Sequence, residues 1–354
     1  MKGIILHGGH GTRLRPLTHT GPKQLLPIAN KPMSEYCLDA IKDAGVTEIC
    51  IIIGGVGANK VKEYYKTGEK FGVKISYIEQ DKPRGIAHAI SLCRKFIGNE
   101  KFLVFLGDNI IKKDIGEFAK NFEETNVDAS LLLCKVSNPS QFGIAELNQD
   151  GSIKKIMEKP ENPPSDLAVT GIYFLTPKIF EVISRLKPSW RNELEITDAL
   201  QMLLAEKNEI KYYMITDYWK DTGTPQDILF ANSEIIKNMK PYFLGEREKE
   251  VEVSGNVMIG KNTRLCNGTK IIGPVIIGEN CIIESEIGPN ASIGNDCNLK
   301  NCKIEDSIIM NNCEINTTAK IKNSIIASNS EIKSNMEDNF GTMLLLGEGS
   351  KIRL

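Results

Sequence analysis

Apolar and polar positions follow two different rhythms along the 354-residue chain, and the change falls near residue 250. Before it, short β-branched runs such as Glu48–Ile53 alternate with segments of helical spacing such as Met33–Ala44 and Gly85–Phe96. This alternation is typical of βαβ units, in which helices cover a mostly parallel sheet. The first rhythm therefore predicts an α/β domain over residues 1–235.

Two of the predicted strands end in residues suited to ligand binding. Gly3–Leu6 runs into a glycine-rich segment, and Lys101–Leu106 is followed by Gly107 and Asp108. In open α/β sheets, ligands bind outside the carboxyl ends of the strands. The sequence therefore predicts a binding site at this edge.

Beyond residue 250, aliphatic residues recur every five or six positions. Small residues often precede each one by two positions, and Cys281, Cys297, Cys302 and Cys313 occupy such places. This spacing predicts a parallel β-helix of hexapeptide repeats, and it explains the cysteines without a metal or a disulfide. The recurring positions are Ile259, Leu265, Ile271, Ile277, Ile282, Ile287, Ile293, Leu299, Ile304, Ile309, Ile315, Ile321, Ile326 and Ile332.

The expected domain boundaries follow from the change in hydrophobic periodicity. Phe230–Met239 has the spacing of a linking helix, and Lys240-Pro241 breaks it. We expect a linker over residues 236–250, a repeat domain over 251–335 and a C-terminal tail over 336–354.

Charge and composition exclude several classes of partner. Lys plus Arg number 44 and Asp plus Glu 45, so a net charge of −1 gives no attraction to nucleic acid or to a membrane surface. No apolar run approaches the ~18 residues of a membrane span, and the N-terminal run is too short for a signal peptide. We expect a cytoplasmic protein that acts on small molecules.

The segment from Gly8 to Arg13 suits phosphate binding. Gly8, Gly9 and Gly11 would let backbone N–H groups approach phosphate oxygens, with Thr12 beside them, and Arg13 adds a guanidinium. Alone, this pattern is more often a plain glycine turn. Lys23, held between Pro22 and Pro27, supplies a second basic group and favours a triphosphate site.

Taken together, the motifs of residues 1–235 resemble those of the glucose-1-phosphate thymidylyltransferases, in their long form with a C-terminal hexapeptide domain. The order and spacing of the motifs carry this resemblance. They are Gly8–Pro16, Pro22–Pro27, Lys31-Pro32-Met33, Gly107-Asp108-Asn109, Glu158-Lys159-Pro160, Thr170–Tyr173, Arg191–Asp198 and Trp219–Gly223. The resemblance implies a Rossmann-like nucleotidyltransferase domain followed by a left-handed parallel β-helix.

The same resemblance assigns roles to separate residues. Asp108 and Asp221 would hold Mg²⁺, whose preferred ligands are carboxylate oxygens and phosphates; from the residues alone, turn capping explains them equally well. Arg13, Lys23 and Lys159 would offset the charge of the reacting phosphates. The sugar phosphate would meet Gly143, Glu158, Lys159, Tyr173 and Arg191, and the base would meet Gln80 and Gly85.

The resemblance implies that glucose 1-phosphate attacks the α-phosphate of dTTP and releases pyrophosphate. UTP is an alternative donor, because the two pyrimidines carry the same imide group. An acetyltransferase activity of the repeat domain is disfavoured, since all four histidines (His7, His10, His19 and His88) lie in the first domain. A non-catalytic subunit is disfavoured because the charged site residues are present. The repeats would serve homo-oligomer assembly.

Two positions depart from the family pattern, and the change at Asn192, where the family commonly has glycine, is minor. His7 stands where the family usually has a small residue beside the glycine loop. Its side chain either faces the nucleotide or packs beneath the strand, and packing is the favoured interpretation.

Overall fold

The computed structural model describes residues 1–9 and 11–334, so His10 and the predicted tail lie outside the described residues. The chain divides into two compact units. The first contains Met1–Gly11, Thr20–Leu25 and Met33–Asp221, and the second contains Thr12–His19, Leu26–Pro32 and the chain from Thr222 onward. Two short N-terminal segments thus group with the second unit. The boundaries expected at residues 235 and 250 stay a prediction.

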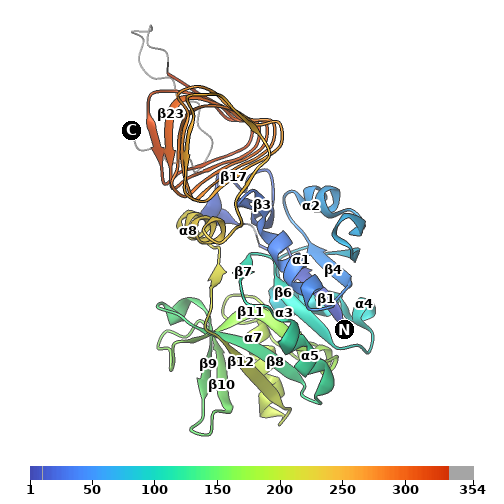
Figure 1. Cartoon of the computed structure of the whole chain (residues 1–354). Helices are drawn as coiled ribbons and strands as arrows, with labels where there is room; N and C mark the ends of the chain where they lie inside the picture. Colours follow the sequence, from blue (N-terminus) through green and yellow to red (C-terminus); the bar gives the residue numbers. More distant parts are fainter. Residues whose placement is uncertain (10, 335–354) are drawn as a thin grey trace. The chain divides into compact units, whose positions relative to one another are not determined.

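A nine-stranded sheet forms the centre of the first unit (Figure 1). The four neighbouring strands β6, β1, β4 and β5 are parallel, as the sequence predicted. β11 then runs antiparallel to β6, β8 and β9, so the sheet is mixed beyond this point. The strands are β1 (Lys2–Leu6), β4 (Glu48–Ile53), β5 (Lys74–Glu79), β6 (Phe102–Leu106), β8 (Ala129–Lys135), β9 (Gly143–Leu147), β10 (Ile153–Glu158), β11 (Leu167–Leu175) and β12 (Ile210–Ile215).

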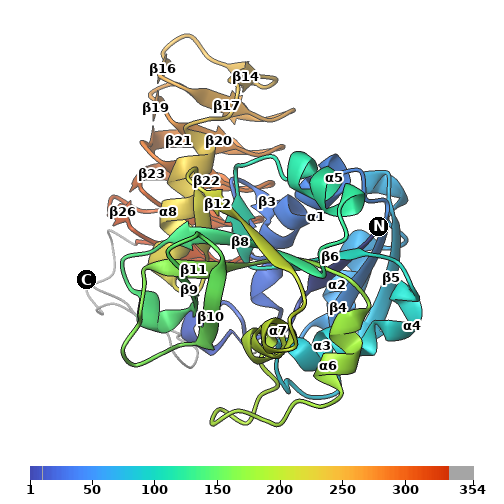
Figure 2. The ribbon, with the colours of Figure 1, turned by 90° about the horizontal axis from the view of Figure 1, so that it is seen from below.

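Helices cover both faces of this sheet because its strands are apolar on both sides. Ile4 and Leu6 of β1 pack with α3 (Ile86–Leu92), α6 (Lys178–Ile183) and α7 (Ile196–Ala205). Ile5 packs on the opposite face, with α1 (Met33–Asp43), α2 (Ala58–Tyr65) and α5 (Gly116–Glu124). Figure 2 shows α3, α6 and α7 on one side of the sheet and α1 and α5 on the other. The long helix expected over Gly85–Phe96 is divided at Cys93 into α3 and α4 (Arg94–Ile97).

The second unit contains three columns of parallel strands that repeat every 16 to 18 residues, for example at Val257, Val275 and Ala291. Figure 1 looks along these coils. The first column is β14 (Tyr242–Phe243), β17 (Val257–Ile259), β20 (Val275–Ile277), β22 (Ala291–Ile293), β24 (Ile308–Ile309) and β27 (Ile325–Ile326). The others share β21 (Ile282–Ile287) and β23 (Asn298–Glu305), and include β15 (Glu246–Arg247), β18 (Arg264–Leu265), β25 (Glu314–Asn316), β28 (Glu331–Lys333), β16 (Glu252–Ser254), β19 (Lys270–Ile272) and β26 (Lys320–Lys322).

The recurring aliphatic residues form the interior of the coils, with one correction. Ile282 was expected to point inward, but it is 45% exposed, and Ile283 is buried instead. Ile283 pairs in register with Leu265 and Leu299. Successive side chains of a strand point to opposite faces, so a shift of one residue reverses the assignment. The four cysteines assigned to the small-residue positions are buried, as expected.

The coils turn at asparagine and aspartate residues with positive φ, a conformation that these side chains tolerate better than most. Their side chains stack from coil to coil. Asn262 Nδ2 donates to Asn280 Oδ1 at 3.1 Å, and Asn280 Nδ2 donates to Asp296 Oδ1 at 3.1 Å. These exposed side-chain hydrogen bonds link the turns of successive coils.

The segment that links the α/β pattern to the hexapeptide repeat differs from the expectation. Helix α8 spans Pro225–Ile236 rather than Phe230–Met239, because Thr224 and Asp227 form a capping box and Pro225 takes the first helical position. β14 and β15 lie within the expected linker and pair with β17 and β18. Tyr242 and Phe243 of β14 are 40% and 42% exposed, so no inward apolar repeat marks this first coil in the sequence.

Candidate functional site

The carboxyl ends of β1 and β6 meet at one edge of the sheet. Leu6 and Leu106 are paired in register, and Gly107 N donates to Leu6 O at 3.0 Å. This pairing places the start of the glycine loop beside Asp108, as the sequence predicted from the two strand ends. Gly9 has φ of +93°, a conformation that glycine adopts readily.

Lys23 and Asp108 form a half-buried ion pair at this edge. Lys23 begins a short 3-10 helix (Lys23–Leu25), and its Nζ donates to Asp108 Oδ2. Burial acts to raise the pKa of Asp108, but the charge of Lys23 and hydrogen bonds from Lys23, the backbone and Asn109 outweigh burial and lower the pKa. The carboxylate is therefore held ionised. Gln24, which sequence reasoning did not select, holds the loop by donating from Nε2 to Gly8 O at 2.9 Å.

Asp221 reaches the same edge from a distant part of the chain. β13 (Trp219–Asp221) pairs antiparallel with β7 (Asn109–Ile111), and Asp221 lies opposite Asn109 in this ladder. Asn109 Oδ1 also accepts a hydrogen bond from Trp219 Nε1 at 2.8 Å. The ladder thus brings Asp221 opposite the residue that follows Asp108.

These two aspartates have the donor chemistry that a magnesium ion requires. Mg²⁺ is bound in proteins by one or two carboxylates together with substrate phosphates and water, and not by a dedicated cage of side chains. Within residues 1–9 and 11–334, no group of three or more His, Cys, Asp or Glu side chains forms such a cage. Asp108 and Asp221 therefore fit a site in which the substrate supplies the remaining ligands.

His7 packs beneath the strand end and does not face solvent, in agreement with the favoured interpretation. Its side chain is 1% exposed, and its ring meets Tyr65 edge to face with centroids 6.0 Å apart. Burial lowers the pKa of His7 to about 3, although the charge of Asp108 opposes this shift. His7 is therefore neutral at physiological pH. Neither ring nitrogen has a hydrogen-bond partner among the described residues.

Gln80 and Gly85, expected to meet the base, lie together. Gln80 is 7% exposed, and its Nε2 lies 3.5 Å from Gly85 O. Gly85 has φ of +101°, and a Cβ there would lie 2.4 Å from Leu194 O, so only glycine fits. Sequence reasoning gave His88 no role at the site, but its Nδ1 lies 2.8 Å from Gln80 Nε2.

A second charged cluster surrounds Glu158 at the end of β10. Thr197 Oγ1 donates to Glu158 Oε2 at 3.0 Å, and a Cβ on Gly143 would lie only 2.6 Å from Thr197 Cγ2. Gly143 was expected to give a sugar access to the backbone, and in the structure its missing side chain makes room for Thr197. Burial raises the pKa of Glu158, and Glu195 raises it further, although Thr197, Lys159 and Arg191 act in the opposite direction.

Arg191 lies among three carboxylates. Its Nη1 is 3.4 Å from both Glu158 Oε1 and Glu195 Oε1, and its Nη2 is 3.3 Å from Glu193 Oε1. Glu195, which is buried, also accepts from Ser189 Oγ at 2.8 Å. The three Arg191 contacts are longer than the ~2.7–2.9 Å of a tight charge-assisted hydrogen bond. The guanidinium is therefore oriented but not closed in a bidentate pair.

Lys159 and Tyr173 complete the expected sugar-phosphate residues of the first unit. Lys159 has φ of +40°, an uncommon conformation for a residue with a side chain, and its Nζ lies 3.9 Å from Glu158 Oε1. Tyr173 is 3% exposed on β11. Burial raises its pKa, as do the charges of Glu158 and Asp108.

Two predicted residues belong to the second unit. Thr12 and Arg13 are exposed residues of a 3-10 helix (Thr12–Leu14). Arg13 Nη2 lies 3.0 Å from the place a Cβ on Gly223 would take, so Gly223 leaves room for the guanidinium. The phosphate role of Arg13 stays a prediction from the sequence motif.

The sequence contained some signals for the residues it missed. Gln24 and Asn109 lie within the family motifs, next to selected residues, and Thr197 and Glu195 follow Arg191 in another motif. Their contacts depend on which distant strand or helix each one meets.

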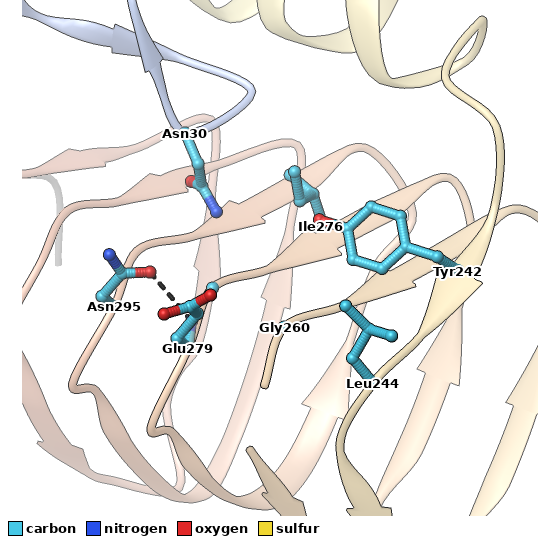
Figure 3. Close-up of a pocket in the computed structure, with 8 residues that line it drawn as sticks. Asn30, Tyr242, Leu244, Gly260, Ile276, Glu279 and Asn295 are labelled. Atoms are coloured by element: carbon cyan, nitrogen blue, oxygen red, sulfur yellow. Dashed lines mark hydrogen bonds between the residues drawn. The ribbon is translucent and has the colours of Figure 1, made fainter. Parts of the chain in front are cut away.

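A cavity of about 310 Å³ lies within the second unit (Figure 3). Tyr242, Leu244 and Ile276 form its apolar walls, and Glu279 and Asn295 supply polar groups. Asn295 Oδ1 accepts from the backbone N of Glu279 at 2.8 Å, so this amide is already engaged. No residue expected to bind nucleotide or sugar lines the cavity.

Among the described residues, no helix is long and apolar enough to span a bilayer.

Comparison with known proteins gives a consistent picture. The nucleotidyl transferase family model matches residues 2–238, and the GMPPB C-terminal domain model matches residues 271–353. A low-salt glycan biosynthesis nucleotidyltransferase of Haloferax volcanii is 39% identical over 359 residues, which is 100% of both chains. A glucose-1-phosphate thymidylyltransferase of Streptomyces antibioticus is 42% identical over 312 residues, 88% of this chain and 87% of its own.

A solved structure of UDP-glucose pyrophosphorylase complexed with UDP-glucose is also similar. It has a TM-score of 0.60 and 29% identity, and it covers 67% of this chain and 99% of that one. The resemblance to the glucose-1-phosphate thymidylyltransferases that the sequence motifs indicated is thus confirmed. The chain belongs to the nucleotidyl transferase family, among the enzymes that act on sugar 1-phosphates.

Proposed function

We propose that this protein joins glucose 1-phosphate to dTTP, forming dTDP-glucose and pyrophosphate. The observation that carries the proposal is the joint presence of two charged clusters in the first unit. One combines Lys23, Asp108 and the glycine loop, and the other combines Glu158 and Arg191. Such a pair of clusters would bind two anionic substrates, a triphosphate at the glycine loop and a sugar phosphate at Glu158 and Arg191.

The reaction needs no nucleophile from the protein. An oxygen of the sugar phosphate attacks the α-phosphorus, a new O–P bond forms, and the bond to the β-phosphate breaks as pyrophosphate leaves. Catalysis of this type depends on positioning and on charge neutralisation. Lys23 neutralises charge at the glycine loop, and Lys159 and Arg191 bind the attacking phosphate. Arg13 retains its expected role at the triphosphate.

Mg²⁺, when bound through Asp108 and Asp221, would supply further positive charge for the phosphate oxygens. Lys23 holds Asp108 in its ionised form, which is the form a cation requires. Glu158 accepts hydrogen bonds from sugar hydroxyls, and Thr197 fixes the orientation of its carboxylate. Gln80 and Gly85 meet the pyrimidine.

We also propose that the second unit is a left-handed parallel β-helix that assembles the protein into a homo-oligomer. The three columns of parallel strands, the inward aliphatic residues and the asparagine turns support this architecture. Sedimentation of the full chain tests the assembly, and a monomer at micromolar concentration would contradict it.

The experiment that tests the reaction is pyrophosphate release with Mg²⁺ and glucose 1-phosphate. We expect the fastest release with dTTP when dTTP, UTP, ATP, CTP and GTP are compared in parallel. A comparable rate with UTP would identify a relaxed pyrimidine site, and release only with UTP would reverse the assignment of the donor. No release with any of the five would overturn the proposed reaction.

A further inference from the structure

The amide of Gln80 has a fixed position beside the glycine loop. Gln80 directly follows β5, and its backbone N donates to Ile53 O at 2.8 Å. Its side chain is almost fully buried, and its Oε1 lies 3.9 Å from the place a Cβ on Gly8 would take. Because Gly8 has no side chain, the carbonyl end of the amide faces the open backbone of the loop.

The opposite end of the amide shows which way round it is bound. Gln80 Nε2 faces two groups, Gly85 O at 3.5 Å and His88 Nδ1 at 2.8 Å. A backbone carbonyl can only accept, so the amino group must lie at this end. His88 Nδ1 then has to accept the second hydrogen bond, which places the ring proton on Nε2 and leaves the imidazole neutral.

Both partners of the amide are held in place. Gly85 packs directly against the backbone of Leu194, and Leu194 N donates to Arg84 O at 2.8 Å. His88 lies on α3, where Ser91 Oγ donates to His88 O at 2.7 Å. Burial lowers the pKa of His88 and the charge of Arg84 adds to this, while Asp81 partly opposes it. The neutral, accepting ring is thus the favoured state.

We propose that His88 is a specificity-determining positioning residue, which orients Gln80 so that only a carbonyl oxygen is offered to the base. Thymine and uracil carry an N3–H donor, which matches this oxygen. Cytosine carries an N3 lone pair instead, and in the same pose two acceptors would face each other. The inference rests on the proposed function, in that it takes Gln80 to meet the pyrimidine.

The test measures binding of dTTP and dCTP to the full chain by calorimetry, with pyrophosphate release measured separately. His88→Leu removes the nearer acceptor and leaves only the longer contact with Gly85 O at 3.5 Å, so the amide of Gln80 is held less firmly in this orientation. We expect the preference for dTTP over dCTP to fall by about tenfold, the effect of about one hydrogen bond, while kcat with saturating dTTP changes by less than about twofold.

His88→Asn is the matched control. Its Oδ1 takes the place of Nδ1 as an acceptor, so we expect the preference to return to within about twofold of the original. The decisive arm is the Gln80→Ala background, in which His88→Leu should leave the dTTP to dCTP ratio unchanged because its target is gone.

Three outcomes separate the inference from the proposed function. An unchanged ratio in His88→Leu, or an equal fall in the Gln80→Ala background, would overturn the inference while leaving the reaction intact. The original protein could bind dTTP selectively without any turnover, and His88→Leu could abolish that selectivity. This outcome would support the inference and overturn the proposed reaction. Equal binding of dTTP and dCTP by the original protein would overturn the inference.

Discussion

The glycine-loop edge and the Glu158–Arg191 cluster both combine partly buried carboxylates with a basic group, yet the pKa values of Asp108 and Glu158 shift in opposite directions. At the loop edge, one lysine meets one carboxylate, and the pKa of Asp108 is lowered. At the other cluster, one guanidinium is shared by three carboxylates, and the pKa of Glu158 is raised. Burial acts to raise both pKa values; at Asp108 the charge and hydrogen bond of Lys23 outweigh burial, whereas at Glu158 the charge of Glu195 adds to it.

This contrast suggests different uses for the two clusters. A close, half-buried ion pair whose carboxylate has a lowered pKa keeps a constant charge and a fixed position, which suits the binding of a cation and a triphosphate. A guanidinium held at 3.3 to 3.4 Å by several carboxylates can change partners when a phosphate arrives. Four predictions test this contrast.

The largest effect is expected at the loop edge. Asp221→Asn removes a carboxylate charge opposite Asn109 and should lower kcat for pyrophosphate release by about 1,000-fold, because charge stabilisation at the phosphates is lost. The control is Asp217→Asn, an exposed residue just before the same strand, which should have no effect. Equal losses in both variants would indicate general disruption of this segment.

Arg191→Lys tests the shared guanidinium. Lysine keeps the charge but lacks the planar fork, so the KM for glucose 1-phosphate should rise by about 10- to 100-fold while the KM for dTTP stays within about twofold. Arg185→Lys is the matched control, since Arg185 is exposed and pairs with Glu206 at 2.6 Å. A rise in the KM for dTTP alone would assign Arg191 to the nucleotide.

Acidification should affect the two clusters in a defined order. Because the pKa of Glu158 is raised, this carboxylate gains its proton at a higher pH than an ordinary glutamate as pH falls. Asp108, with a lowered pKa, stays ionised over the same range. The KM for glucose 1-phosphate should therefore rise first, while the KM for dTTP remains constant.

The sugar phosphate itself titrates near pH 6, so the profile needs a reference. Glu158→Gln supplies it, because glutamine cannot titrate and only the substrate's own titration remains. If the KM for glucose 1-phosphate depends on pH in the same way in Glu158→Gln and in the original protein, the titration of Glu158 does not cause the rise at low pH.

Thr197→Val should have the smallest effect. Valine preserves the packing against Gly143 but removes the hydrogen bond to Glu158 Oε2. This hydrogen bond lowers the pKa of Glu158, so its loss should raise that pKa. We expect a two- to threefold higher KM for glucose 1-phosphate at pH 8, the effect of a weak hydrogen bond. On acidification, the rise in this KM should begin at a higher pH than in the original protein. Movement to lower pH would contradict the assigned role of the hydroxyl.

Local periodicity predicted the elements well where each strand or helix carries its own apolar pattern. Glu48–Ile53 is a strand with the predicted bounds, and Met33–Asp43 is a helix one residue shorter than expected. The repeat spacing located most of the inward residues of the coils, but not Val257 or Val275. It failed at Ile282, because two neighbouring isoleucines share one strand and only pairing decides which one faces inward.

The site was less predictable because its contacts join distant parts of the chain. The motifs selected Asp108 and Asp221, but only the β7–β13 ladder places Asp221 opposite the residue that follows Asp108. The burial of His7, the sharing of Arg191 and the orientation of the Gln80 amide all depend on neighbours that no local pattern specifies.

The sequence by itself determined the alternation of strands and helices, the six-residue repeat and the family to which the chain belongs. These follow from periodicity and from residue types at fixed spacing, which each segment carries alone. Only the tertiary structure decided the charge states and orientations within the site. A pKa or an amide orientation depends on burial and on nearby charges, and folding brings these from segments far apart in the chain.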